Sequence, residues 1–295
     1  MGVCTLSFII ALPPTSERRR LLDALTTVLD GSGAVKSCSI VGSMSPVSEE
    51  RVVGFADYDV LLLVDDYEDA IRFEQALRVA LADHAFAGTI VRAWGVVGKT
   101  AGPPPLVHLL ADPVWAFARR SALLRYSLAK YPPLHGTALA DYGPRHPPTL
   151  EVLQRDRLGP VALLDKLRRH DYRARGWERD PGGWQLRSLR SPVASEVDFA
   201  LYAALHSARN VLRHFNAYPE STATSALPEL MARENRDVAH RLGALVAAKL
   251  RLRVGDSAVA SDPGVRSAAL DLLEDLRTWC GLTMDWDREA EASGL

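Results

Sequence analysis

Two short apolar segments beside acidic and glycine residues constrain this sequence more than any other feature. Residues 38–41 form a run that stops at Gly42, and residues 60–64 read Val-Leu-Leu-Leu-Val directly after Asp57 and Asp59. Both runs are too short for an independent helix and are typical of buried strands. Side chains alternate along a strand, so the two aspartates point to the same side, with Cα atoms about 6.6 Å apart. The sequence therefore predicts two strands with a pair of carboxylates at one edge.

The paired carboxylates imply a compensating cation. Like charges at the start of a buried strand repel each other and lose hydration unless a cation or hydrogen-bond donors surround them. Carboxylates this close can hold the same divalent ions. Gly42 lets the backbone approach a ligand, and Ser43 can offer N–H groups and a hydroxyl to a phosphate. The alternative is a hairpin or edge strand whose aspartates face water, but the buried run 60–64 favours the ligand site.

A known signature contains these residues in this order. Gly42-Ser43, thirteen intervening residues and Asp57-x-Asp59 closely resemble the motif of the polymerase-β-like nucleotidyltransferase superfamily. In that superfamily the Gly-Ser turn grips the nucleotide triphosphate, and the Asp-x-Asp pair binds two magnesium ions. The resemblance covers residues 16–112. It implies that Gly42 and Ser43 orient the β- and γ-phosphates and that Asp57 and Asp59 hold two Mg²⁺ ions.

The chain departs from the superfamily at the third acidic position, which lies on a later strand. The matching residue here is His108, within the apolar run 106–110, and Asp112 in phase with it is the other candidate. A histidine there could ligate a metal, or accept the proton of an acceptor hydroxyl, since its ordinary pKa is near 6.5. It could also be a structural residue. The departure leaves open a site that binds nucleotide without catalysis.

Hydrophobic periodicity predicts an α+β fold, with a small mixed sheet backed by helices and followed by an α-helical bundle. We expect helices over 15–31 and 65–84 and further strands over 89–97 and 106–110. Helical spacing also marks 115–130, 197–215, 227–252 and 265–280, whereas 131–148 reads as a loop and 177–184 as a turn.

The predicted domains are a catalytic domain over residues 1–115 and a helical domain over 116–295. The second is divided into a basic segment at 116–192, a bundle at 193–286 and a polar tail at 287–295. A chain of 295 residues that is 47% hydrophobic can bury the cores of two domains.

Charge is distributed unevenly along the chain. Residues 1–115 carry 9 Lys and Arg against 14 Asp and Glu, and residues 116–192 carry 15 against 7. An acidic metal-bearing region beside a basic one suits a magnesium–triphosphate substrate. Lys166 in the basic segment is a candidate triphosphate contact, with a solvated lysine as the alternative. No long basic run indicates duplex nucleic acid as a partner.

The sequence favours a cytoplasmic protein with no membrane partner. The apolar run 6–12 is too short to span a bilayer, and no basic residue precedes it as in a secretory signal. Three widely spaced cysteines, Cys4, Cys38 and Cys280, indicate reduced thiols and not a disulfide framework or a zinc site.

The helical half suggests two further resemblances. A bundle after the catalytic core resembles antibiotic nucleotidyltransferases, in which the acceptor lies between the two domains. Arg209 and His214 match the arginine-polar-x-x-x-histidine motif of HEPN domains, a helical family that includes ribonucleases. Five residues on a regular helix rotate through about 140° net, so the two side chains do not share a face. We favour solvated positions for both.

These observations together predict an enzyme that moves a nucleoside monophosphate from a nucleoside triphosphate to a hydroxyl or phosphate acceptor and releases pyrophosphate. ATP is the favoured donor, and a small molecule such as an antibiotic or a natural-product intermediate is the favoured acceptor. A toxin/antitoxin-type enzyme acting on tRNA or protein is the first alternative. A non-catalytic nucleotide-binding module and a HEPN-type ribonuclease are the others.

Overall fold

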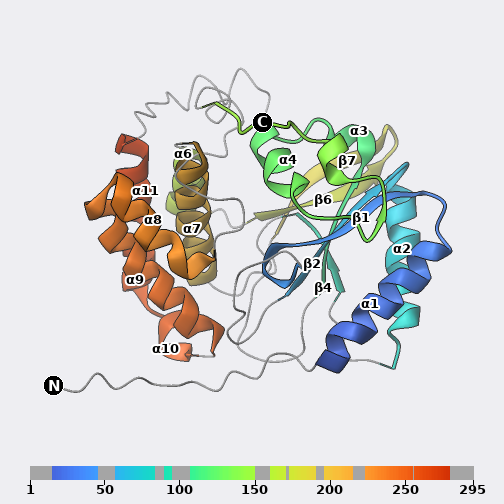
Figure 1. The fold of residues 1–295 in the computed structure, drawn as a ribbon, viewed down its shortest axis with the longest axis horizontal. Helices are drawn as coiled ribbons and strands as arrows, with labels where there is room; N and C mark the ends of the chain where they lie inside the picture. The colour runs from blue at the N-terminus through green and yellow to red at the C-terminus, as the bar shows by residue number, and fades with distance from the viewer. Residues whose placement is uncertain are drawn as a thin grey trace.

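A five-stranded mixed sheet forms the centre of the first part of the chain (Figure 1). The computed structural model describes residues 15–45, 57–83, 90–94, 107–149, 160–170, 173–190, 196–214, 223–254 and 256–279. The strands are β1 (Val35–Val41), β2 (Tyr58–Val64), β3 (Ile90–Arg92), β4 (Val107–Pro113) and β5 (His135–Gly136), and their order is β3-β4-β2-β1-β5. The β2, β3 and β4 strands run parallel, whereas β1 is antiparallel to both β2 and β5.

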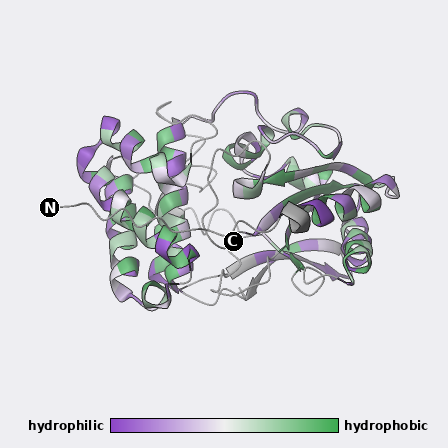
Figure 2. Ribbon diagram, turned by 60° about the horizontal axis from the view of Figure 1, so that its bottom comes forward, coloured by the Kyte–Doolittle hydropathy of each residue, from purple (hydrophilic) through white to green (hydrophobic). Residues whose placement is uncertain are grey.

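The central strand β2 is covered on both faces. Val60, Leu62 and Val64 pack in one cluster with α1 (Thr15–Asp30) and α2 (Tyr67–Ala80). The intervening leucines pack on the opposite face, against side chains from the segment after β4. A strand buried on both faces needs apolar residues at every position, which explains its unbroken apolar run. Figure 2 shows the sheet as a hydrophobic layer.

A helical bundle with its own core makes up the second part of the chain (Figure 1). Its helices are α6 (Pro160–Arg168), α7 (Glu196–His214), α8 (Leu227–Glu234), α9 (Arg236–Arg253), α10 (Ser257–Ala260) and α11 (Pro263–Trp279), with a short 3₁₀ turn η4 (Thr224–Ala226). The α7 helix packs against α6, α9 and α11. The predicted α+β class, a mixed sheet followed by a helical bundle, is confirmed.

Much of the predicted basic segment packs with the sheet and not with the bundle. It contributes α3 (Val114–Phe117), α4 (Ala122–Ala129), η3 (Leu139–Asp141) and a two-stranded hairpin, β6 (Arg173–Asp180) and β7 (Gly183–Arg190). Phe117, Leu128 and Leu139 share a cluster with Leu61 and Leu63 of β2. The boundary predicted at residue 115 therefore falls inside a packed unit.

The hairpin extends the sheet beyond β3. The backbone N–H of Trp94 donates to the Arg175 carbonyl at 2.7 Å, and the Arg175 N–H donates to the Trp94 carbonyl at 2.6 Å. Trp177 and Trp184 of the hairpin pack against the same cluster as α1 and α2. The turn predicted at 177–184 is thus the tip of a hairpin, and its flanking strands were not predicted.

Two helices predicted as continuous are each interrupted by a capping residue. The segment predicted at 115–130 is α3 and α4, and Ser121 accepts a hydrogen bond from the Leu124 N–H at the start of α4. The segment predicted at 227–252 is α8 and α9, because Asn235 has extended backbone and accepts from the first N–H groups of α9. A cap residue satisfies those groups only from a non-helical conformation, so the helix breaks there.

Candidate metal centre

Strand register brings residues that are far apart in sequence to one end of the sheet. Val41 pairs with Asp59 across β1 and β2, and Asp59 pairs with His108 across β2 and β4. Gly42 directly follows the end of β1, and Asp57 directly precedes the start of β2. The structure therefore brings together Gly42, both aspartates and His108.

Asp57, Asp59 and His108 form a compact set of potential metal ligands. One ligand atom from each residue can be chosen so that all three atoms lie within 4.8 Å of one another. Asp57 and His108 are 5% and 4% exposed, whereas 27% of the Asp59 side chain is accessible. Carboxylate oxygens and an imidazole nitrogen are ordinary ligands for divalent cations. The set is closed on one side by protein and reachable through Asp59.

The two nitrogens of the His108 ring have different partners. Nε2 lies 2.6 Å from the carbonyl oxygen of Ala93, and Nδ1 lies 3.0 Å from Oδ1 of Asp59. A carbonyl oxygen only accepts, so Nε2 carries a hydrogen and donates it. Nδ1 then either carries a second proton, donated to Asp59, or points its lone pair at a carboxylate. The second arrangement is favourable when a cation lies between them.

Burial by itself lowers the pKa of His108, but the hydrogen bond and charge of Asp59, together with the charge of Asp57, outweigh it, so the pKa is raised above 6.5. Since both ring nitrogens already face protein atoms, neither is directed at an acceptor hydroxyl. The arrangement fits the predicted metal ligand better than the predicted general base.

Gly42 occupies a position where a side chain would be strained. Its φ is +72°, and a Cβ atom there would lie 2.7 Å from Oδ2 of Asp59. Gly42 begins a 3₁₀ turn η1 (Gly42–Met44), which is closed by a hydrogen bond from the Ser45 N–H to the Gly42 carbonyl at 3.2 Å. The turn therefore starts beside Asp59, and a residue with a side chain at its first position would be strained. The contact of Ser43 with a phosphate stays a prediction.

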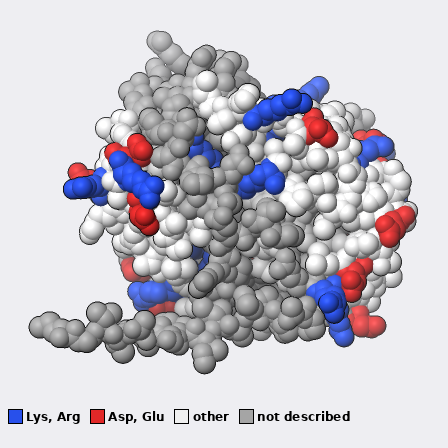
Figure 3. Space-filling view, in the orientation of Figure 1, with Lys and Arg blue, Asp and Glu red and all other residues white. Residues whose placement is uncertain are grey.

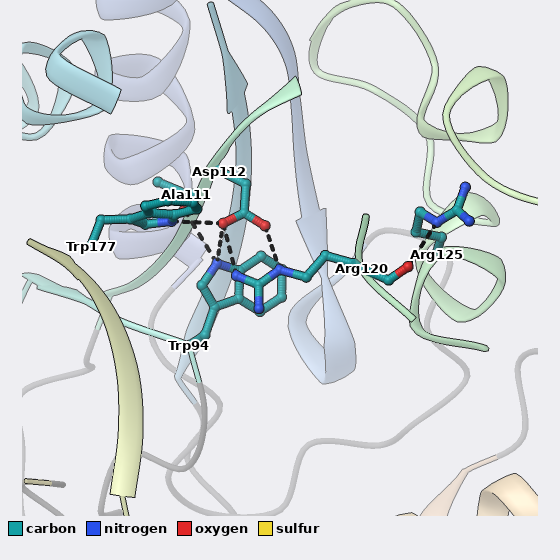
Figure 4. Close-up of polar contacts among 6 residues, drawn as sticks. All are labelled: Trp94, Ala111, Asp112, Arg120, Arg125 and Trp177. Carbon is teal, nitrogen blue, oxygen red and sulfur yellow. Dashed lines mark hydrogen bonds and ion pairs between the residues drawn. The ribbon is translucent and has the colours of Figure 1, made fainter. Parts of the chain in front are cut away.

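Asp112 lies away from this set. It pairs in register with Leu63, four residues further along β4 than His108. Its buried carboxylate accepts hydrogen bonds from the indole N–H of Trp94 and of Trp177, both at 2.9 Å, and from Arg120 at 2.7 and 2.8 Å (Figure 4). Of the two candidates for the third acidic position, His108 is the one next to Asp59, and Asp112 instead ties the hairpin to the sheet.

A row of α7 side chains, not predicted from the sequence, lies within electrostatic reach of Asp59 in the candidate metal centre. Tyr202 and His206 stack with ring centroids 5.2 Å apart, and Arg209 and Arg213 continue the row. Desolvation by the surrounding protein and the charge of Asp59 together raise the pKa of the Tyr202 hydroxyl to about 12. Burial, with the nearby charges of Arg213 and Arg209, lowers the pKa of His206 to about 3.

The row meets the sheet-based part through α4 and Tyr131. Arg213 donates to the Ser127 hydroxyl at 2.6 Å. The Tyr131 side chain forms a hydrogen bond with the Gly42 backbone. Its pKa is affected by the nearby charges of Arg213, Arg209 and Asp59. Among described residues on the face drawn in Figure 3, a few basic side chains lie near the middle, and basic and acidic side chains lie together towards both sides. The spacing 202, 206, 209 and 213 was the available sequence signal, because it marks one helix face.

The remaining sequence candidates have different outcomes. Arg209 donates to the Thr224 hydroxyl, and its Nε atom is buried, so the prediction of a solvated Arg209 is wrong. The side chain of His214 lies outside the described residues. Lys166 lies on α6, which packs against α7 and α11, and its contact with a triphosphate stays a prediction.

Comparison with protein-family models and with curated proteins finds no match to this chain. Within the described residues, no helix is both long and apolar enough to span a membrane.

Proposed function

We propose that this protein is a nucleotidyltransferase that moves a nucleoside monophosphate from a nucleoside triphosphate, with ATP favoured, to an acceptor. An oxygen of the acceptor hydroxyl or phosphate forms a bond to the α-phosphorus. The bond between that phosphorus and the bridging oxygen to the β-phosphate breaks, and pyrophosphate leaves with the bonding electrons. A hydroxyl acceptor gives up its proton to solvent or to a nearby base.

The observation that carries the proposal is the approach of the Gly42–Met44 turn to Asp59. A Cβ atom on Gly42 would lie 2.7 Å from Oδ2 of Asp59, so the start of the turn and the Asp59 carboxylate lie beside each other. A phosphate held by backbone N–H groups and by the Ser43 hydroxyl would lie beside the cation-binding carboxylates, as phosphoryl transfer requires. Neither feature alone would indicate this chemistry.

The donor set fits a divalent cation. Asp57 and Asp59 would hold the two Mg²⁺ ions that the family resemblance implies, and His108 stands next to them. When bound, such ions supply charge stabilisation for the attacking oxygen and for the leaving pyrophosphate. Asp59 and His108 lie on the paired strands β2 and β4, and Asp57 directly precedes β2, so the sheet would hold these ligands in position before substrate binds.

The α7 row would form a second wall of the same site, contributed by the helical bundle. Arg209 and Arg213 carry positive charge towards Tyr131 and Gly42, where the phosphates would lie. Tyr202, although its surroundings raise the pKa of its hydroxyl, keeps 37% of its residue surface accessible and offers a surface for a base or an acceptor. A small-molecule acceptor is therefore favoured.

A free, buried thiol at Cys38 accords with a reducing cytoplasm.

The experiment is a transfer assay with each of the four α-labelled nucleoside triphosphates, a divalent cation and a panel of small-molecule, tRNA and protein acceptors. We expect label on one acceptor class. Asp57→Asn should reduce transfer at least about 10³-fold, since the ions supply several kcal/mol. The matched control, Asp141→Asn, changes an exposed aspartate in the η3 turn and should keep wild-type rates. Nucleotide binding without transfer to any acceptor would instead favour the non-catalytic alternative.

A further inference from the structure

The imidazole of His108 makes the donor set of this centre different from an all-carboxylate one. Its Nε2–H donates to the Ala93 carbonyl at 2.6 Å, so Nδ1 is the nitrogen turned towards Asp59 and Asp57. A metal-binding histidine ordinarily donates its other ring N–H to a carbonyl or carboxylate, which fixes the tautomer and increases the basicity of the ligating nitrogen. His108 has this arrangement.

The carbonyl that fixes the tautomer is itself held in place. Ala93 is buried, and the next residue, Trp94, exchanges two backbone hydrogen bonds with Arg175 of the hairpin, at 2.7 and 2.6 Å. The Trp94 indole also donates to Asp112 at 2.9 Å. The hairpin and the Asp112 cluster therefore indirectly orient the ring of His108.

We infer that the centre prefers a divalent transition-metal ion, with Mn²⁺ as its representative, over Mg²⁺, and that His108 Nδ1 is a direct ligand. Mg²⁺ is a hard ion that binds oxygen and gains little from imidazole, whereas affinity for nitrogen-containing sites rises along the first transition row from Mn²⁺. Two carboxylates and one imidazole leave coordination positions open for phosphate oxygens. This inference deepens the proposed function and rests on its assumption that Asp57 and Asp59 bind a cation.

The first test uses the full chain, stripped of metal by chelation, and Mn²⁺ alone. Electron paramagnetic resonance counts bound Mn²⁺, and spin-echo envelope modulation detects a coordinated ¹⁴N nucleus. We expect about one bound ion with ¹⁴N modulation, displaced only by a Mg²⁺ excess of roughly 100-fold or more. Bound Mn²⁺ without ¹⁴N modulation, or displacement by equimolar Mg²⁺, would overturn the inference. Neither depends on a variant that has to fold.

The second test compares His108→Asp with the control His240→Gln, a histidine exposed on α9. We expect His108→Asp to lose the ¹⁴N modulation and to lower the Mn²⁺ preference at least about tenfold, while the control keeps both. Retention of the modulation in His108→Asp would assign the nitrogen elsewhere and overturn the inference.

The two proposals fail differently. Transfer that is equally fast with Mn²⁺ and Mg²⁺, without ¹⁴N coordination, would contradict the metal preference but not the nucleotidyltransferase proposal. If neither Mn²⁺ nor Mg²⁺ binds, even with ATP present, both the metal preference and the nucleotidyltransferase proposal are contradicted.

Discussion

The β4 strand carries a polar cluster near each end, and the two clusters have opposite compositions. At one end, Asp112 is a single carboxylate surrounded by N–H donors from Trp94, Trp177 and Arg120. At the other end, two carboxylates gather around the single imidazole of His108. The first cluster is balanced by protein groups alone. The second brings two carboxylates together beside one imidazole, which are ordinary ligands for divalent cations, and this composition is the basis for proposing the chemistry there.

Replacing Asp112 should break the balanced cluster and cause the largest effect on stability. Asp112→Ala leaves the buried guanidinium of Arg120 and two indole N–H groups without their acceptor, so we expect a loss of about 3–5 kcal/mol. Urea unfolding followed by circular dichroism measures this loss. Asp141→Ala, at an exposed aspartate, is the control. A loss below about 1 kcal/mol for Asp112→Ala would mean that the cluster does not hold the hairpin.

Replacing Ser43 should affect ligand binding and leave the fold intact. One hydroxyl that donates to a charged phosphate is worth about 1.5–3 kcal/mol, so Ser43→Ala should weaken binding of the nucleoside triphosphate by about 10- to 150-fold. Calorimetric titration with a non-hydrolysable ATP analogue measures the change. Identical binding curves for the variant and wild type would remove the turn from the site.

Replacing Gly42 should disturb the carboxylates through steric contact. In Gly42→Ala the new Cβ atom meets Asp59 Oδ2 at 2.7 Å, and the backbone has a φ of +72°, which costs an alanine about 1–2 kcal/mol. We expect that loss of stability together with weaker metal binding. Gly33→Ala is the matched control, because a Cβ there meets nothing within 4 Å. Equal metal affinity in the two variants would contradict the close approach.

The α7 row should make the protein sensitive to acid. The pKa of His206 is lowered to about 3 in the folded state, against about 6.5 when unfolded. Between these values the unfolded state binds more protons, so stability is fully present above pH 6.5 and falls as the pH drops towards 3. In His206→Gln, the stability lost between pH 7 and 4 should be smaller than in wild type by at least about 1 kcal/mol. Urea titrations at several pH values test this, with parallel losses in both proteins as the contrary result.

The sequence allowed prediction of the features that depend on local pattern. The apolar run of β2, the helices α1 and α2 and the Gly42–Asp59 spacing each depend on a few neighbouring residues. The meeting of Gly42 and Asp59 at one edge of the sheet was predictable because side-chain alternation and strand pairing follow fixed rules. That His108, and not Asp112, lies beside Asp59 required the register of β4 against β2.

Features that depend on distant partners were not predictable in the same way. The hairpin strands are rich in arginine and carry few apolar residues, so no strand pattern stood out; their stabilising contacts are with Trp94 and Asp112. The break at Asn235 is a different case, because its side chain accepts from the nearby N–H groups of Asp237 and Val238, and an asparagine is a local signal for the start of a helix. The orientation of the α7 row depends on how the bundle packs against the sheet-based part.

The most direct test of the central claim is whether ATP binding depends on a divalent cation held by Asp57 and Asp59. Equilibrium dialysis of labelled ATP should show that wild type binds ATP in the presence of Mg²⁺ or Mn²⁺. The affinity for ATP should fall by at least about 100-fold when a chelator is added, and by a similar factor in Asp57→Asn and in Asp59→Asn. The melting temperatures of both variants should match or exceed that of wild type, since each removes a like charge. ATP binding that is equally tight with the chelator, or in both variants, would contradict the assignment of this cluster as a metal and nucleotide site.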